Sequence, residues 1–116
     1  MLEVWTYRQD VLTEPTIDLS SFKVEARDGD IGKVDESTNK AGQSWIVVDT
    51  GPWIFGKKVV LPASTIERID MDRRVVVVDR TKDEIKNAPE FLPERGVDAA
   101  YREELADYYG GASVRR

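Results

Sequence analysis

The chain has 116 residues, 41% of them apolar and 34% charged, which suits one domain with a real core and is too short for two ordinary ones. Its net charge of -5 argues against nucleic acid or an anionic membrane as the main partner. The absence of cysteine and histidine removes disulfides, thiolate chemistry, the commonest general base and the commonest metal ligand. No apolar run approaches the roughly 18 residues of a membrane-spanning helix, and the N-terminus does not resemble a signal peptide. We therefore expect a cytoplasmic protein with no membrane span.

Residues 1–18 are expected to form an extended or irregular N-terminal extension, because Pro15 blocks a helix there. Two interpretations of Trp5 stay open. It packs against the body of the domain, or the extension reaches a second subunit. We favour packing on the same domain, since an undocked terminus would fray.

From Leu19 the pattern becomes typical of β-structure. Residues 22–27 alternate apolar and charged side chains, the period of a half-buried strand. Asp28-Gly29-Asp30 predicts a tight turn, and a return strand follows over Ile31–Asp35. Gly32 inside that strand indicates a bulge, a bend or close packing under a neighbouring side chain.

The stretch Ser44–Pro62 is the most informative part of the sequence. Trp45–Asp49 carries apolar side chains on both faces, which predicts a strand covered from both sides. A return strand is expected over Lys57–Leu61. Between them lies the apolar tip Trp53-Ile54-Phe55, which has to be buried in its own core or in a partner.

Two further strands are predicted at Ile66–Asp70 and Arg74–Asp79, after a short connection over Ala63–Thr65. In the first of them, Ile66 and Ile69 are expected on opposite faces. Six strands within about 60 residues, joined by short polar turns, indicate a small antiparallel barrel or sandwich.

Two helices are predicted after the strands. Thr81 and Glu84 form a capping box for a short helix that ends near Asn87, before Pro89. The segment Glu90–Gly96 then reads as a linker.

The second helix is predicted to be capped by Asp98 and to cover Ala99–Tyr109, with Gly110-Gly111 as its stop and a disordered tail beyond. Tyr101, Leu105 and Tyr108 form one apolar stripe. That stripe docks on its own barrel or on another protomer.

Four motifs occur in the order found in a known family: DGDIGKV, IVVDTGPWIFGKKVVLP, IERIDMDRRVVVV and TKDEIKNAPE. In this order they resemble the PRC-barrel domain, named for the cytoplasmic domain of the photosynthetic reaction-centre H subunit. The resemblance covers about Leu19–Glu90. It divides the chain into an N-terminal extension (1–18), a PRC-barrel-like domain (19–90), and a linker, helix and tail (91–116).

The resemblance implies a small, highly bent β-barrel with little chemistry of its own. Family members with known roles act as binding modules, as in the reaction centre, in the C-terminal domain of the ribosome maturation factor and in an archaeal cell-division protein. Many stand-alone members are expected to be dimers. Neither the H-subunit role nor the maturation-factor role carries over, because their additional segments have no counterpart in this sequence.

Three candidate sites compete with plainer interpretations. The carboxylates Asp28, Asp30, Asp35 and Glu36 are close in sequence, but their spacing does not match an EF-hand loop, so we favour solvated turn residues over a Mg²⁺ or Ca²⁺ site. Asp49 faces Lys57 or Lys58, and we favour a cross-strand ion pair over a catalytic pair. The doublets Lys57-Lys58 and Arg73-Arg74 lie near aromatic residues, as an RNA site would require, but we favour solubilising charge.

The sequence therefore predicts a non-enzymatic, cofactor-free protein-interaction or assembly module, expected to be a homodimer. The candidate partner-binding residues are Trp53, Ile54, Phe55, Tyr101, Leu105 and Tyr108, with Trp5 a weaker candidate. The alternative is an RNA- or ribosome-associated processing factor, marked by a continuous basic surface. A small-ligand protein or enzyme ranks third and would need a pocket converging on Asp49 and a lysine.

Overall fold

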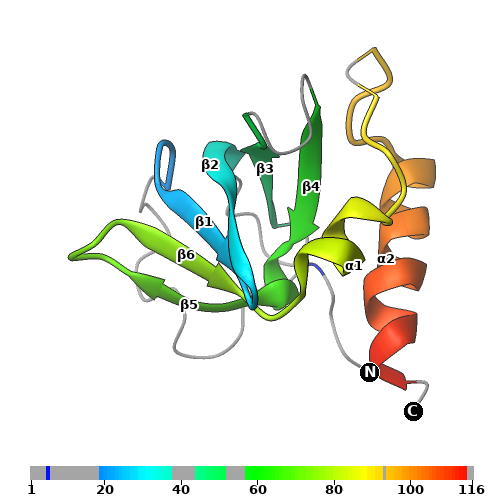
Figure 1. The fold of residues 1–116 in the computed structure, drawn as a ribbon. Helices are drawn as coiled ribbons and strands as arrows, with labels where there is room; N and C mark the ends of the chain where they lie inside the picture. Colours follow the sequence, from blue (N-terminus) through cyan, green and yellow to red (C-terminus); the bar gives the residue numbers. More distant parts are fainter. Residues whose placement is uncertain (1–4, 6–18, 38–43, 52–56, 93, 115–116) are drawn as a thin grey trace.

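The computed structural model describes residues 5, 19–37, 44–51, 57–92 and 94–114, and shows a six-stranded sheet curled into a half-barrel with two helices after it (Figure 1). The strands are β1 (Lys23–Ala26), β2 (Gly29–Ser37), β3 (Trp45–Asp49), β4 (Lys58–Pro62), β5 (Ile66–Asp70) and β6 (Val75–Val78). The helices are α1 (Lys82–Lys86) and α2 (Ala99–Val114), and a 3-10 turn spans Ala63–Thr65. The predicted mostly β class, the six strands and the two helices are confirmed.

The sheet is mixed, whereas the sequence predicted antiparallel pairing throughout. The strand order is β4-β3-β2-β1-β6-β5, and β1 pairs with β6 in parallel while the other neighbours are antiparallel. The parallel pair joins the β1–β4 meander to the β5–β6 hairpin. Hydrophobic alternation within a strand does not reveal its neighbour's direction, so the parallel pairing of β1 with β6 could not be predicted from either strand alone.

A three-residue connection explains the curl of the sheet. β4 and β5 are the two edges, yet Pro62 and Ile66 are separated only by the turn at Ala63–Thr65. Edges of a flat six-stranded sheet would lie about 24 Å apart at the usual strand spacing. Because three residues of 3-10 helix advance only about 6 Å, the sheet has to bend until its edges meet at this corner.

The core lies on the concave side and follows the predicted alternation. Phe22, Val24 and Ala26 are buried, and the charged residues between them are not. Strand β3 is buried on both faces through Ile46–Val48, as predicted for a covered central strand.

Gly32 marks a bulge between β1 and β2, as predicted, but a backbone rather than a side chain lies against it. The register shifts between Val24 and Glu25. At φ +144°, a Cβ on Gly32 would meet the carbonyl oxygen of Asp49 at 2.0 Å. The glycine therefore permits the end of β3 to cross β2 at close range.

A second bulge changes the predicted faces of β5. The register skips Glu67, so Ile66 lies opposite Val78 and Ile69 lies opposite Val76. Ile66 and Ile69 consequently share the core face, and the expectation that they point to opposite sides is wrong. The extra residue of a bulge reverses the alternation on one side of it.

Both helix starts are confirmed, and one helix end is wrong. The capping box of Thr81 and Glu84 is present, with bonds of 2.8 and 3.2 Å. The Asp98 carboxylate accepts from the Tyr101 N–H at 2.8 Å, as an N-cap should. However, α2 continues across Gly110-Gly111 to Val114, into the predicted tail. A glycine costs a helix only about 1 kcal/mol, so two of them do not enforce a stop. Neither described helix is long and apolar enough to cross a membrane.

Candidate functional site

A groove of about 220 Å³ lies between the edge strand β4 and the chain that leaves α1. Figure 1 shows this chain passing alongside β4 before it turns into α2. The lining residues are Lys57, Lys58, Val59, Val60, Ile85, Lys86, Ala88, Pro89, Glu90, Phe91 and Tyr109. The floor and walls are therefore largely apolar, with lysines among the lining residues.

The groove follows the edge of the sheet. One wall consists of Lys57 and the first three residues of β4, Lys58–Val60, whose side chains alternate between the two faces of the strand. A groove that lay over one face of the sheet would contact only every second residue of the strand. Contact with all four means that the groove runs along the strand's outer edge.

The hydrogen bonds between β3 and β4 determine which backbone groups point outward. The Thr50 N–H donates to the C=O of Lys57 at 3.4 Å, and the Ala63 N–H donates to the C=O of Ser44 at 3.0 Å. These two pairs flank the five β3–β4 pairs at either end and continue the same register. Antiparallel pairs alternate between bonded and non-bonded, so every second residue of β4 turns its N–H and C=O away from β3.

Because of this alternation, the backbone N–H and C=O of Val59 point toward β3, and those of Val60 point toward the groove. Val59 lies opposite Val48, in a pair of the hydrogen-bonded kind, whereas Val60 lies opposite Val47, in a pair of the other kind. Pro62 fits the same assignment, because a proline on an edge strand lacks its N–H on the outward side. The wall of the groove thus carries the outward N–H and C=O of Val60.

The opposite wall is held in place by α2. The Tyr101 hydroxyl donates to the C=O of Pro89 at 3.1 Å, and its ring lies 6.0 Å from the ring of Phe91. The Tyr108 hydroxyl donates to the C=O of Glu84 at 2.6 Å. Tyr101 and Leu105 are buried in this chain, so the stripe docks on its own barrel. A partner-binding role for Tyr101, Leu105 and Tyr108 stays a prediction.

Tyr109 is the site residue that the sequence analysis missed. It is 2% exposed, while Tyr108 is only half-buried. Tyr101, Leu105 and Tyr109 recur every four residues, a spacing that could have identified it. Tyr109 lines the groove, and its buried hydroxyl has no hydrogen-bond partner among the described residues. Burial raises the pKa of this phenol above its ordinary value.

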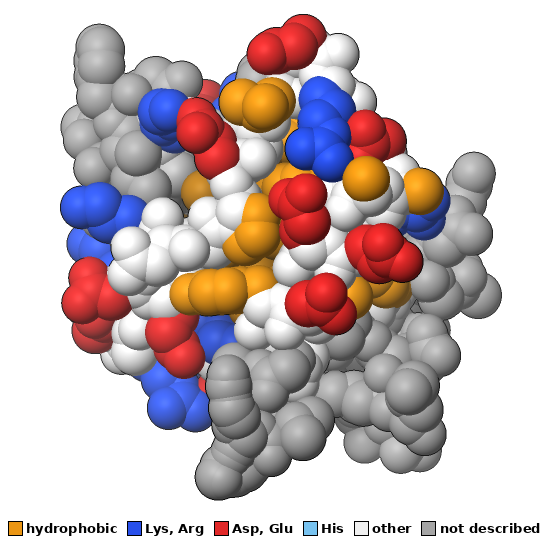
Figure 2. Space-filling view, turned by 90° about the vertical axis from the view of Figure 1, so that its right-hand side faces the viewer, with side chains coloured by type: hydrophobic (Ala, Val, Ile, Leu, Met, Phe, Trp, Pro, Cys, Tyr) orange, Lys and Arg blue, Asp and Glu red, His pale blue; other side chains and the backbone are white. Residues whose placement is uncertain are grey.

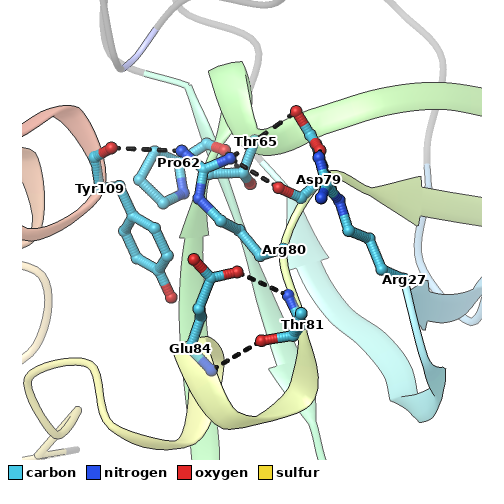
Figure 3. Close-up of polar contacts among 8 residues, drawn as sticks. All are labelled: Arg27, Pro62, Thr65, Asp79, Arg80, Thr81, Glu84 and Tyr109. Carbon is cyan, nitrogen blue, oxygen red and sulfur yellow. Dashed lines mark hydrogen bonds and ion pairs between the residues drawn. The ribbon is translucent and has the colours of Figure 1, made fainter. Parts of the chain in front are cut away.

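Arg80 fixes the position of Tyr109 (Figure 3). Its Nη2 donates to the C=O of Tyr109 at 3.2 Å, and its guanidinium lies 5.7 Å from the centre of the ring. Its Nη1 donates to the C=O of Asp79 at 2.6 Å, and the Asp79 N–H donates to the C=O of Thr65 at 2.7 Å. The Arg80 side chain therefore ties the segment that follows β6 to the C-terminal half of α2.

The lysines of the groove form exposed ion pairs. Lys57 pairs with Glu90, and Lys58 Nζ donates to Asp35 Oδ2 at 2.9 Å. The register places Asp49 opposite Lys58, but the Asp49 carboxylate accepts from the Gly51 N–H at 3.0 Å. The Asp49 carboxylate and the Lys58 ammonium, which lie opposite each other in the register, therefore each have another partner. Exposed pairs of this kind contribute less than about 1 kcal/mol and exchange readily.

The other charged residues considered as candidate sites form local structural contacts. Asp28 accepts from the Lys82 N–H at 2.9 Å and so caps α1. Arg73 lies 3.8 Å from Glu25 and 4.0 Å from Asp70. The turn between β5 and β6, which carries Arg73-Arg74, lies far from the start of β4 in Figure 1, so the two basic doublets do not form one surface. Among the described residues, no group of three acidic side chains could hold a metal ion.

Trp5 packs on its own domain, as favoured. Its C=O accepts from the Ser44 N–H at 2.8 Å, and its ring meets that of Trp45 edge to face at 5.8 Å. The other predicted partner-binding residues, Trp53, Ile54 and Phe55, lie outside the described residues.

Comparison of the sequence with protein-family models and with curated proteins finds no match.

Proposed function

We propose that this chain is a non-catalytic protein-interaction module that binds a partner in the β4 groove. The groove itself carries the proposal, because it combines an apolar lining with an edge strand. The ionisable groups around it, Lys57, Lys58 and Asp49, are engaged in exposed pairs and a turn, which favours binding over chemistry. The resemblance to the PRC-barrel family, whose known members are binding modules, supports the same class of function.

Homodimerisation, and contact with a partner through Trp53-Ile54-Phe55, are further parts of this proposal that come from the sequence. Sedimentation equilibrium at micromolar concentration tests the first. A monomer at all concentrations would remove the homodimer from the proposal and leave the groove in it.

The groove is tested by comparing two arginine substitutions. Val59→Arg places a bulky cation on the groove wall, and Val77→Arg places one at a half-buried valine of β6 outside the groove. Each protein is immobilised in native cell extract, and bound proteins are quantified by mass spectrometry. We expect Val59→Arg to lose the specific partner while Val77→Arg retains it. Equal retention by the two variants, with both shown folded by circular dichroism, would contradict the proposal.

A further inference from the structure

We infer that the groove binds an extended, acidic and apolar peptide segment, which joins the sheet as an additional strand beside β4. This inference rests on the proposed function and specifies the chemistry of the partner. It follows from the direction of the β4 backbone, the course of the groove, its charge and the phenol of Tyr109.

The direction of the β4 backbone groups suits an extended partner. The N–H and C=O of Val60 point toward the groove, where the lining is apolar and Val60 itself is 2% exposed. Backbone polar groups in such surroundings are normally paired. A peptide in β conformation supplies both partners at once, as in other cases of strand addition.

The course of the groove suits a linear segment, because its lining follows consecutive residues of the edge strand. Its volume of about 220 Å³ is below the range of roughly 300–1,000 Å³ typical of pockets for drug-sized ligands, so it would hold only some side chains of such a segment. Val59 on one wall and Phe91 on the other offer contacts for apolar side chains of such a segment. Because successive side chains of a strand alternate, every second residue of the peptide is expected to be apolar.

Charge selects acidic residues at the other positions. The lining includes three lysines, Lys57, Lys58 and Lys86, and one carboxylate, Glu90. Lys57 pairs with Glu90 and Lys58 with Asp35, but these exposed pairs exchange readily, so an acidic segment can take their place. This cationic site belongs to a protein of net charge -5, and the neighbouring face over α2 shows acidic side chains around hydrophobic ones (Figure 2). An acidic segment would be attracted to the groove and repelled by the acidic side chains of the neighbouring face, which gives both orientation and specificity.

Tyr109 supplies the last contact. Tyr109 lines the groove, and its buried hydroxyl has no hydrogen-bond partner in the described part of the chain. An unpaired buried donor is unusual in a folded protein. A carbonyl or carboxylate oxygen of the bound peptide would satisfy it.

The experiment uses a displayed library of random eight-residue peptides, selected on the whole chain and counter-selected on Val59→Arg. We expect enrichment of alternating apolar residues with Asp or Glu between or beside them. Absence of selective enrichment, or enrichment of basic or proline-rich peptides, would overturn the inference.

The best peptide is then synthesised with single N-methyl groups along its backbone. We expect N-methylation at alternate positions to weaken binding at least about tenfold, while the positions between tolerate it. Amide exchange of Val60 should slow on binding, and that of Val59, which is already turned toward β3, should not. Binding without the two-residue periodicity and without protection of Val60 would exclude strand addition.

Substitutions that leave the fold intact test the charge and the phenol. Lys86→Glu, at an exposed groove residue, should weaken the peptide several-fold, and Lys23→Glu, at an exposed lysine outside the groove, should not. Tyr109→Phe should weaken it as well. If native partners depend on Val59 while no peptide shows these effects, the proposed function stands and this inference fails.

Discussion

The two edges of the sheet, β4 and β5, are built in opposite ways. β5 is interrupted by the bulge at Glu67, and both Glu67 and Arg68 are exposed. β4 pairs with β3 through five consecutive positions without a bulge, and it carries Val59, Val60 and Leu61. Natural proteins protect edge strands with charges and bulges, because an open edge pairs with other strands.

This difference indicates which edge strand is the better candidate for pairing with an additional strand. β5 has both protective features, so it is expected to stay unpaired in solution. β4 has no bulge and carries a charge only at its first residue, Lys58, and it ends at Pro62, which limits an added strand to the part beside the groove. The predictions below test this contrast, beginning with the largest expected effect.

Gly32→Ala should destabilise the β4 side of the sheet most strongly. The new Cβ would meet the Asp49 carbonyl oxygen at 2.0 Å, so the β3–β4 hairpin would have to move. We expect a loss of more than about 3 kcal/mol in unfolding free energy, measured by urea titration with tryptophan fluorescence.

Gly51→Ala is the matched control, since Gly51 also has positive φ but has no atom within 4 Å of its Cβ position. Its cost should be about 1–2 kcal/mol, from backbone strain alone. Equal costs at the two glycines would mean that the contact with Asp49 does not hold the hairpin.

Proline substitutions should distinguish the two backbone directions of β4. Val59→Pro removes an N–H that is turned toward β3, and Val60→Pro removes one that points to the groove. We expect Val59→Pro to cost about 1–3 kcal/mol more in unfolding free energy, because it leaves a ladder carbonyl unpaired. Urea unfolding measures both. A larger cost for Val60→Pro would show that the assignment of outward groups is wrong.

Tyr109→Phe should raise stability by about 1 kcal/mol at neutral pH, because it removes a buried hydroxyl without a partner among the described residues. Tyr108→Phe is the control and should lower stability, since that hydroxyl donates to the C=O of Glu84. A loss of stability in Tyr109→Phe would mean that its hydroxyl is satisfied in solution.

The same substitution predicts a change in pH dependence. Burial raises the pKa of Tyr109 in the folded state above its ordinary value of 10.0. The neutral phenol therefore favours folding fully below pH 10, and this contribution declines as the pH rises above 10. Tyr109→Phe should make the loss of stability between pH 10 and pH 11 less steep, as measured by urea unfolding. An unchanged slope would assign that loss to other groups.

Removing the charges of the β5 edge should have the smallest effect on folding. Glu67→Val combined with Arg68→Val should change stability by less than about 0.5 kcal/mol but cause concentration-dependent association, observed by light scattering. Glu103→Val with Asp107→Val adds apolar area on exposed positions of α2 and should not associate to the same extent. Equal association would show that hydrophobicity, and not the strand edge, is responsible.

Local patterns in the sequence determined most of the elements. Alternation over 22–27 predicts β1 and its buried face, and the capping box of Thr81 and Glu84 predicts the start of α1. The turn at Asp28-Gly29-Asp30 and the N-cap at Asp98 were also predicted from the sequence. These features depend on residues a few positions apart, so their physical causes lie within the segment itself.

Tertiary structure alone decided the rest. The parallel pairing of β1 with β6, the curl imposed by the connection at Ala63–Thr65 and the groove beside β4 join segments distant in the chain. Tyr108 and Tyr109 both lie at helical spacing from Tyr101 and Leu105, and packing decided that Tyr109 is the more buried of the two. Packing also decided that α2 continues past Gly110. In an isolated helix, the intrinsic propensities that would favour one helix end over another differ by only about 1 kcal/mol or less. The free energy of packing against the rest of the domain is larger than these differences and therefore decides the outcome.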